Sequence, residues 1–214
     1  MNRAEAPRPL RRDAAENRER VIEAAGVVFA EHGLDAGVDE VAKLAGVGMG
    51  TLYRRFPTKQ ALIEELIGNL RRELLRLADV AAERTDGTGL EELLVAVGQL
   101  QAEQAGCLQQ LMEQSDAELE TLREFRLQLD RLLAEAQRQG RVRPDVTRGD
   151  ISMLLWSLSG VIQTTRTVAP HAWRRHLELF LAGLRPVGAV EFDQPLQEKP
   201  LTIAQAERAT RARG

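Results

Sequence analysis

The sequence predicts an all-α protein with an amino-terminal three-helix domain, which contains a helix-turn-helix, and a larger carboxy-terminal helical domain. Apolar residues recur every three or four positions along most of the 214-residue chain, which is the spacing of one face of an α-helix. Strong helix formers such as Ala, Leu, Glu and Arg dominate the composition, and no segment alternates convincingly between polar and apolar residues. A chain of this length can bury a substantial core in one or two domains.

The first expected helix spans residues 14–32, and Gly33 follows it at the position where glycine commonly ends a helix. Its apolar face consists of Val21, Ile22, Ala25, Val28 and Phe29. Residues 1–13 are polar, contain two prolines and are expected to form a flexible basic arm. The arginines of this arm fit two alternatives equally, insertion into a DNA minor groove or a solvated tail: Arg3, Arg8, Arg11 and Arg12.

Residues 37–56 have the pattern of a helix-turn-helix, in which two short helices are joined by a tight turn. The apolar residues that mark the two helices are Val41, Ala42 and Ala45 in the first and Leu52 and Phe56 in the second. Gly46 lies between them, where a sharp reversal favours a residue that tolerates a positive φ. The second helix of such a motif enters the DNA major groove, so residues 14–59 are predicted to form a DNA-binding domain.

Residues 60–185 are expected to form the second helical domain, and residues 186–214 a flexible tail. Thr58 is placed to cap the first helix beyond the motif. The apolar periodicity predicts six helices, over about residues 58–84, 90–100, 107–112, 115–139, 148–168 and 171–184.

The helix expected over residues 148–168 is apolar nearly all round and therefore needs cover on both sides. Few other elements remain at this chain length to provide that cover, which favours a second copy of the chain over interior helices in a monomer. The residues predicted at the homodimer interface are Ile151, Leu155, Leu158, Ile162, Trp173, Leu177, Phe180 and Leu181.

The segment GVGMGTLYRRFPTKQAL resembles the signature of the TetR family of bacterial transcriptional regulators. Upstream, RVIEAAGVVFAEHGLDAGVDEVA resembles that family's first helix and the start of its second, so the specific resemblance covers about residues 20–66. One departure is Gly37, where the family usually has threonine or serine as a helix N-cap. The resemblance implies a ligand-responsive repressor that binds a palindromic operator as a homodimer.

The residues predicted to contact DNA come from the second helix of the motif and from the start of the helix after it. They are Gly48, Met49, Gly50, Thr51, Tyr53, Arg54, Arg55 and Lys59. By resemblance, Tyr53 and Lys59 contact phosphates. Met49 and Thr51 can meet a thymine methyl group, and either arginine can read guanine or hold a phosphate.

A pocket for an unidentified small-molecule effector in the second domain is implied by the resemblance alone. Its candidate residues are Gln104, Cys107, Met112, Trp156, Gln163 and Thr164, with Arg166 beside them. Each of them also fits an ordinary role as a core residue or a satisfied polar group.

Composition and motifs disfavour other classes of protein. The net charge of −3 divides into +1 over residues 1–59 and −4 over the rest, so the basic residues are concentrated near the motif. A single cysteine and no secretory or membrane-spanning segment lead us to expect a cytoplasmic protein that does not contact membranes. His171 and His176 lack metal-ligand spacing and no phosphate-binding loop is evident, so we expect neither an enzyme nor a metal or other cofactor. The remaining alternative is a helical scaffold that binds partner proteins but not DNA.

Overall fold

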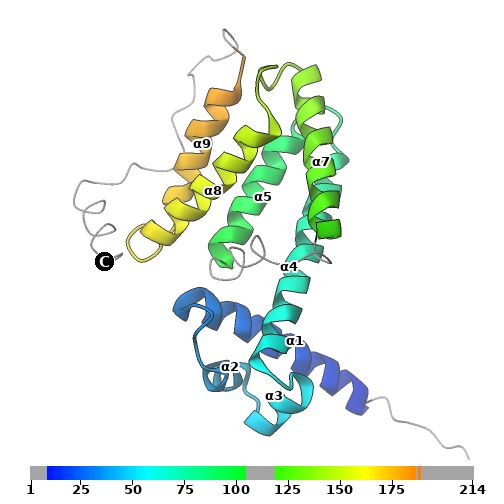
Figure 1. The fold of residues 1–214 in the computed structure, drawn as a ribbon, viewed down its shortest axis with the longest axis vertical. Helices are drawn as coiled ribbons and strands as arrows, with labels where there is room; N and C mark the ends of the chain where they lie inside the picture. The colour runs from blue at the N-terminus through cyan, green and yellow to red at the C-terminus, as the bar shows by residue number, and fades with distance from the viewer. Residues whose placement is uncertain (1–8, 105–118, 187, 189–214) are drawn as a thin grey trace, which may run out of the picture. The chain divides into compact units, whose positions relative to one another are not determined.

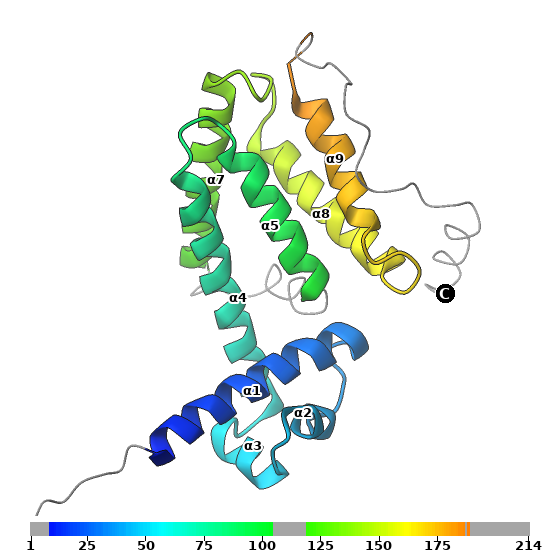
Figure 2. The same ribbon diagram turned by 180° about the vertical axis from the view of Figure 1, so that it is seen from behind.

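The computed structural model describes residues 9–104, 119–186 and 188, and these contain eight helices and no strand. The helices are α1 (Pro9–His32), α2 (Val38–Ala45), α3 (Met49–Arg55), α4 (Lys59–Ala82), α5 (Gly89–Glu103), α7 (Leu119–Arg138), α8 (Arg148–Thr165) and α9 (Ala172–Leu184). The predicted all-α fold is therefore confirmed for the described part of the chain (Figures 1 and 2). The helix expected over residues 107–112 lies outside the described residues.

The described residues divide into two compact units. The first holds α1, α2, α3 and the part of α4 up to Leu70, and the second holds the rest of α4 from Arg71 together with α5, α7, α8 and α9. No helix in the described ranges is both long enough and apolar enough to span a membrane.

The core of the first unit forms where α1 packs on α2 and α2 on α3. Its fully buried members include Ala25, Phe29, Val41, Leu52 and Leu62. The spacing of Ala25, Phe29, Val41 and Leu52 predicts apolar helical faces, which explains why α1, α2 and α3 pack together.

Two cations lie over aromatic rings at the edge of this first core. The Arg18 guanidinium carbon is 5.8 Å from the Phe56 ring centroid, and Arg18 Nη2 is also 2.7 Å from Glu65 Oε1. Lys59 Nζ is 5.8 Å from the Phe29 ring centroid. These contacts tie the start of α4 and the end of α3 to α1.

The helix ends of the first unit follow from local chemistry. Gly33 has a φ of 77° after α1, as expected for a glycine that ends a helix. The Thr58 hydroxyl accepts a hydrogen bond of 3.0 Å from the Ala61 N–H, which confirms Thr58 as the cap of α4. The first helix differs from expectation, because α1 begins at Pro9 and not at residue 14. Pro9 suits the first turn, where a missing N–H costs no hydrogen bond. Residues 1–8 of the expected arm lie outside the described residues.

Helices α5 and α8 form the centre of the second unit, since they contact each other and each also contacts α7 and α9 (Figures 1 and 2). The fully buried residues here include Leu90, Leu93, Leu94, Ile151, Leu154, Leu158 and Trp173. Gly98 lets α5 approach the Trp173 ring closely, because a β-carbon at that position would lie only 2.6 Å from Trp173 Cζ3. The close packing of α5 against α9 therefore depends on this glycine.

Hydrogen bonds fix the segment that links α7 to α8. The Arg143 N–H donates a 2.8 Å hydrogen bond to the carbonyl of Leu184, and Gln137 Nε2 donates to the carbonyl of Val146 at 2.9 Å. At the start of α8, the Thr147 hydroxyl and the Thr147 N–H both donate to Asp150 Oδ2, at 2.7 and 2.8 Å. These bonds fix the residue at which α8 begins.

Most residues of α8 and α9 predicted at a homodimer interface do not lie on the surface of the protomer. Five of the eight are buried inside the protomer's own core, so they have no surface to offer a second subunit: Ile151, Leu158, Ile162, Trp173 and Leu177. Leu155, Phe180 and Leu181 are half-buried. The strongly exposed apolar side chains are instead Met153 and Trp156 on α8 and Leu179 on α9. The spacing does not separate the two sets of residues, because α8 is apolar on both sides and periodicity cannot say which side a neighbouring helix of the same chain will cover.

Candidate DNA-binding helix and effector-binding region

The turn between α2 and α3 has the geometry of a Schellman motif. Gly46 has a φ of 65°, its N–H donates to the carbonyl of Lys43, and the Val47 N–H donates to the carbonyl of Ala42 at 3.0 Å. This pair of bonds satisfies two carbonyls at the end of α2 and reverses the chain. The turn therefore sets the crossing of α2 and α3, and glycine at position 46 is required by its backbone conformation.

One side of α3 is anchored in the core and the other faces outward. Leu52 and Phe56 are buried, and the Phe56 N–H donates to the carbonyl of Leu52 at 2.8 Å. The predicted DNA-contacting residues fill the rest of the helix surface: Gly48, Met49, Gly50, Tyr53, Arg54 and Arg55 are exposed, and Thr51 is half-buried. None of these seven residues is buried in the core, so each is accessible at the surface.

Gly48 and Gly50 are not required by packing within the protein. Neither has a positive φ, and a β-carbon built on either residue meets no other atom within 4 Å. Glycine costs roughly 1 kcal/mol relative to alanine inside a helix, so Gly50 weakens α3 without an internal benefit. The pair leaves the backbone of α3 accessible to a large ligand.

The start of α2 shows how the chain accommodates Gly37. Gly37 is the N-cap of α2 in an extended conformation and provides no side-chain cap. A β-carbon at this position would lie 2.1 Å from Asp39 Oδ1, so the Asp39 side chain occupies the space that a serine or threonine would need. Asp39 lies in the first turn of α2, where a negative charge interacts favourably with the helix dipole.

The position of Lys59 is electrostatically unfavourable within the protein itself. It is the first residue of α4, where the helix dipole disfavours a positive charge, and it is half-buried. Tyr53 is 45% exposed, and its hydroxyl makes no hydrogen bond to the described residues. Lys59 Nζ lies over the Phe29 ring but makes no ion pair with a described residue, so its charge and the Tyr53 hydroxyl can both meet an anionic partner.

The residues expected around the effector do not form one group. Trp156 and Gln163 are exposed on α8, and the Thr164 hydroxyl donates to the carbonyl of Gly160 at 2.8 Å, one turn back on the same helix. Arg166 follows α8 and is half-buried. Cys107 and Met112 lie outside the described residues. Among the described members of the expected set, Gln104 has a buried side-chain oxygen that finds no hydrogen-bond donor.

A second glutamine was missed by the sequence analysis. Gln101 is buried on α5, its Nε2 donates to the carbonyl of Leu155 at 3.5 Å, and its Oε1 finds no donor among the described residues. Gln104 Oε1 is also buried without a donor in this part of the chain. A buried acceptor without a donor costs on the order of 1–3 kcal/mol. The sequence contains a signal for both glutamines. Leu90, Leu94 and Val97 mark one apolar face of the helix, and the same spacing continued along the helix reaches Gln101 and Gln104.

The described residues contain no group of three or more histidine, cysteine, aspartate and glutamate side chains arranged to hold a metal ion.

Comparison with known proteins identifies both units. Residues 21–66 match the profile of bacterial regulatory proteins of the tetR family, and residues 78–186 match the profile of the SbtR-like transcriptional regulator C-terminal domain. An HTH-type transcriptional regulator of Staphylococcus aureus is 46% identical over 54 residues, which make up 25% of this chain and 29% of the relative. The curated relative is thus matched over less than a third of its length.

Solved structures extend the likeness over most of the chain. A TetR transcription regulatory protein from Mycobacterium vanbaalenii is 35% identical with a TM-score of 0.60, covering 83% of this chain and 100% of that one. A TetR transcriptional regulator from Streptomyces coelicolor is 31% identical with a TM-score of 0.58, covering 80% of this chain and 99% of its own. A γ-butyrolactone receptor described as ArpA-like, 21% identical with a TM-score of 0.65 and covering 94% of this chain and 99% of its own, shares the fold. The two profiles and the first two of these structures agree with the helix-turn-helix and the helical second unit, and the chain belongs to the TetR family of bacterial transcriptional regulators.

Proposed function

We propose that this regulator is a homodimeric repressor that holds a palindromic operator through α3 and releases it when a small molecule binds the second unit. The observation that carries the proposal is the outward side of α3, where two glycines without an internal role lie among Thr51, Tyr53 and Arg54. A regulator of this kind acts on bacterial DNA and therefore works in the cytoplasm. Its partners are double-stranded DNA, a second copy of the chain and the effector.

The DNA contacts divide into two kinds by chemistry. Tyr53 and Lys59 are assigned to phosphates, because a hydroxyl and an ammonium group at helix surfaces position a protein on the backbone without reading sequence. Met49, Thr51, Arg54 and Arg55 are assigned to the major groove, where a methyl group can contact thymine and a guanidinium can bind guanine. Gly48 and Gly50 would let the helix backbone approach the groove.

A dimer is supported by the apolar side chains that remain uncovered on the second unit. Met153 and Trp156 are each 62% exposed on α8, and Leu179 is 54% exposed on α9. Methionine and tryptophan are enriched at protein interfaces and depleted from solvated surfaces. A two-fold contact through the outer faces of α8 and α9 would cover these residues, and a two-fold dimer matches the symmetry of a palindromic operator with half-sites about one helical turn apart.

The effector site is proposed at the buried end of α5. Gln101 and Gln104 both present a carboxamide oxygen without a donor among the described residues, so a ligand that donates hydrogen bonds would satisfy both. Release from DNA then requires that the effector bind more tightly to the conformation that fits the operator poorly. The effector and the operator would weaken each other's binding by the same factor.

Footprinting of the purified protein on the DNA beside its own gene, followed by random-site selection, tests the DNA proposal. We expect a protected palindrome. Tyr53→Phe and Lys59→Gln should weaken binding to all sequences by a similar factor, and Lys59→Gln should also reduce the salt dependence. Arg54→Gln should change the preference at particular base pairs, and Arg123→Gln on α7 serves as a matched loss of exposed charge. Absence of any selected sequence would refute the proposal and favour a scaffold.

Trp156→Glu tests the dimer separately. Sedimentation of the purified variant should give the monomer mass with the helical content unchanged, because a buried unpaired charge is costly at an apolar interface. A dimer that withstands this change as well as it withstands Leu127→Glu, on the exposed side of α7, contradicts the proposed interface.

A further inference from the structure

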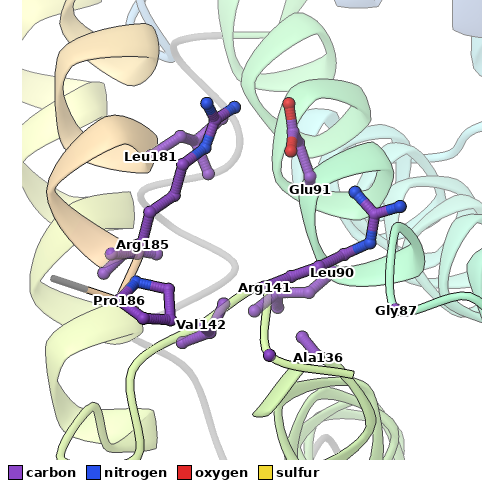
Figure 3. A pocket seen from close by; sticks show the side chains of 11 residues that line it. Gly87, Leu90, Glu91, Ala136, Arg141, Val142, Leu181, Arg185 and Pro186 are labelled. Atoms are coloured by element: carbon purple, nitrogen blue, oxygen red, sulfur yellow. The ribbon is translucent and has the colours of Figure 1, made fainter. Parts of the chain in front are cut away.

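A pocket of about 310 Å³ lies within the second unit (Figure 3), and neither of the two glutamines of α5 lines it. It is bounded by the start of α5, the end of α7 with the link that follows, and the end of α9. This volume is at the lower end of the range found for small-molecule sites. None of the residues assigned above to DNA, effector or subunit contact lines it, apart from Leu181.

The floor of the pocket is formed by apolar side chains that are buried or half-buried. Leu90, Val142 and Leu184 are buried, and Leu181 is half-buried beside them. The backbone bond from Arg143 to Leu184 joins the link to α9 directly beside this floor. The floor is therefore suited to a short apolar group.

The rim of the pocket carries charged side chains, and only some of them are paired with an opposite charge. Arg141 Nε donates to the carbonyl of Asp86 at 2.7 Å, and its Nη2 is 3.9 Å from Asp86 Oδ2. The Arg185 guanidinium and the Glu91 carboxylate make no ion pair with each other or with another described residue, although both line the pocket (Figure 3). A guanidinium without a partner at the edge of an apolar floor can bind a carboxylate through two parallel hydrogen bonds.

A neighbouring hollow adds a further uncompensated cation. It runs along α5 past Val95 and Gln99 and shares Glu91, Arg141 and Arg185 with the pocket. Arg174 lines this hollow, and its Nη2 donates to Gln99 Oε1 at 2.7 Å while its Nη1 is 2.9 Å from His171 Nδ1. Neither partner is a carboxylate. The other acidic residue of the hollow, Glu92, is paired with Arg84 at 2.9 Å. Positive charge therefore exceeds negative charge along this surface.

We propose that this pocket binds an organic monoanion, a carboxylate with a short apolar body. The carboxylate would meet the Arg185 guanidinium in the field of Arg141 and Arg174, and the apolar body would lie on Leu90, Leu181 and Leu184. Glu91 would oppose this ligand by charge repulsion. The proposal goes beyond the proposed function, because it concerns a separate pocket and its test uses no DNA.

The test is calorimetric titration of the full-length protein with hexanoate, with hexanamide as the neutral analogue and acetate as the analogue without an apolar body. We expect hexanoate to bind at least about tenfold more tightly than hexanamide, because a charge-assisted hydrogen bond is lost in the amide. Acetate should bind more weakly than hexanoate because it leaves the apolar floor uncovered.

Two substitutions that change the charge of the pocket in opposite directions provide the sharpest control of hexanoate binding. Arg185→Gln should weaken hexanoate binding about tenfold, and Glu91→Gln should strengthen it, whereas Arg126→Gln on the exposed side of α7 should leave it unchanged. Leu181→Trp, which fills part of the pocket, should abolish binding, and circular dichroism checks that this variant is folded. Equal binding of hexanoate and hexanamide, no effect of Arg185→Gln, or weaker binding in Glu91→Gln would each overturn the proposal.

Discussion

Gly50 in α3 and Gly98 in α5 are both helical glycines, but only one of them is explained by the protein itself. A β-carbon at Gly98 would lie 2.6 Å from Trp173 Cζ3 and 3.0 Å from Leu158 Cδ2. At Gly50 the same atom would meet nothing within 4 Å. Each glycine weakens its helix by roughly 1 kcal/mol relative to alanine. At Gly98 close packing compensates this cost, whereas at Gly50 any compensation must come from a partner.

The starts of α2 and α3 differ from the start of α8 in a similar way. In the first unit α2 and α3 begin after Gly37 and Gly48, and neither cap provides a side-chain hydrogen bond. In the second unit α8 begins with the Thr147–Asp150 pair of hydrogen bonds. The two helices of the helix-turn-helix thus lack the local stabilisation that the start of α8 has, as is common at functional surfaces.

Trp173→Ala should have the largest effect, because it removes the ring on which Gly98 packs. Truncating a fully buried aromatic residue leaves a cavity and typically costs about 3–5 kcal/mol of unfolding free energy. Urea unfolding followed by circular dichroism measures the loss. Leu127→Ala, at a 52% exposed position on α7, should change stability by less than about 0.5 kcal/mol. Equal effects of the two changes would contradict the packing described for α5 and α9.

Gly98→Ala should come next, with a loss of about 1–3 kcal/mol from overpacking that the better helix propensity of alanine only partly offsets. The added methyl group must displace the buried Trp173 ring, since that ring has little freedom to move. Unfolding of the double variant with Trp173→Ala is the control. The double variant should be more stable than the sum of the two single losses predicts, because the cavity accepts the methyl group. Strict additivity would show that Gly98 does not act through Trp173.

Most of the fold could be predicted from the sequence, because helical periodicity and turn glycines act locally. The Gly46 turn, the Thr58 cap and the buried face of α3 all follow from residues within one or two turns of each other. The side of α8 that faces the protomer's own core could not be predicted, since it depends on where α5 and α9 pack. For the same reason Ile151 and Leu158 were assigned to a subunit interface although they are buried within the protomer.

The candidate sites differ in the same respect, namely whether spacing within one helix is enough to identify them. The exposed residues of α3 could be identified because the four-residue spacing of Leu52 and Phe56 marks the buried positions and leaves the remaining positions of this short helix outside the core. The buried acceptors of Gln101 and Gln104 could not, because a polar residue on an apolar face is recognised as unsatisfied only once its neighbours are known. The pocket beside Arg185 joins three segments distant in sequence, and no local pattern indicates it.

Gly50→Ala should separate stability from DNA binding. Alanine strengthens α3, and the open space around position 50 imposes no penalty, so the unfolding free energy of the free protein should rise by up to about 1 kcal/mol. Affinity for the selected operator should fall about tenfold if the backbone of α3 approaches the bases closely. Thermal unfolding and fluorescence anisotropy measure the two quantities. Unchanged affinity in the more stable variant would mean that Gly50 has no role at the groove.

The smallest effect concerns the capped start of α8. Hydrogen bonds from the Thr147 hydroxyl and N–H lower the pKa of the Asp150 carboxyl below its usual range. A lowered pKa in the folded state means that the stabilisation is present above the ordinary aspartate pKa and is lost as the pH falls through the folded value. Thr147→Val removes the hydroxyl donor and keeps the N–H, so unfolding free energy measured from about pH 6 to pH 3 should fall less steeply than in the wild type.

Thr147→Ser retains the hydroxyl and should restore the wild-type acid dependence. The carboxyl is exposed, so the difference between the valine variant and the wild type should remain small at neutral pH and grow smaller still in acid, where Asp150 is protonated in both proteins. Gly48 offers α3 no equivalent bond, and adding acid should therefore leave the start of α3 without a comparable loss. An unchanged acid slope in Thr147→Val would mean that the hydroxyl bond does not contribute to stability, and the start of α8 would then no longer differ in this respect from the starts of α2 and α3.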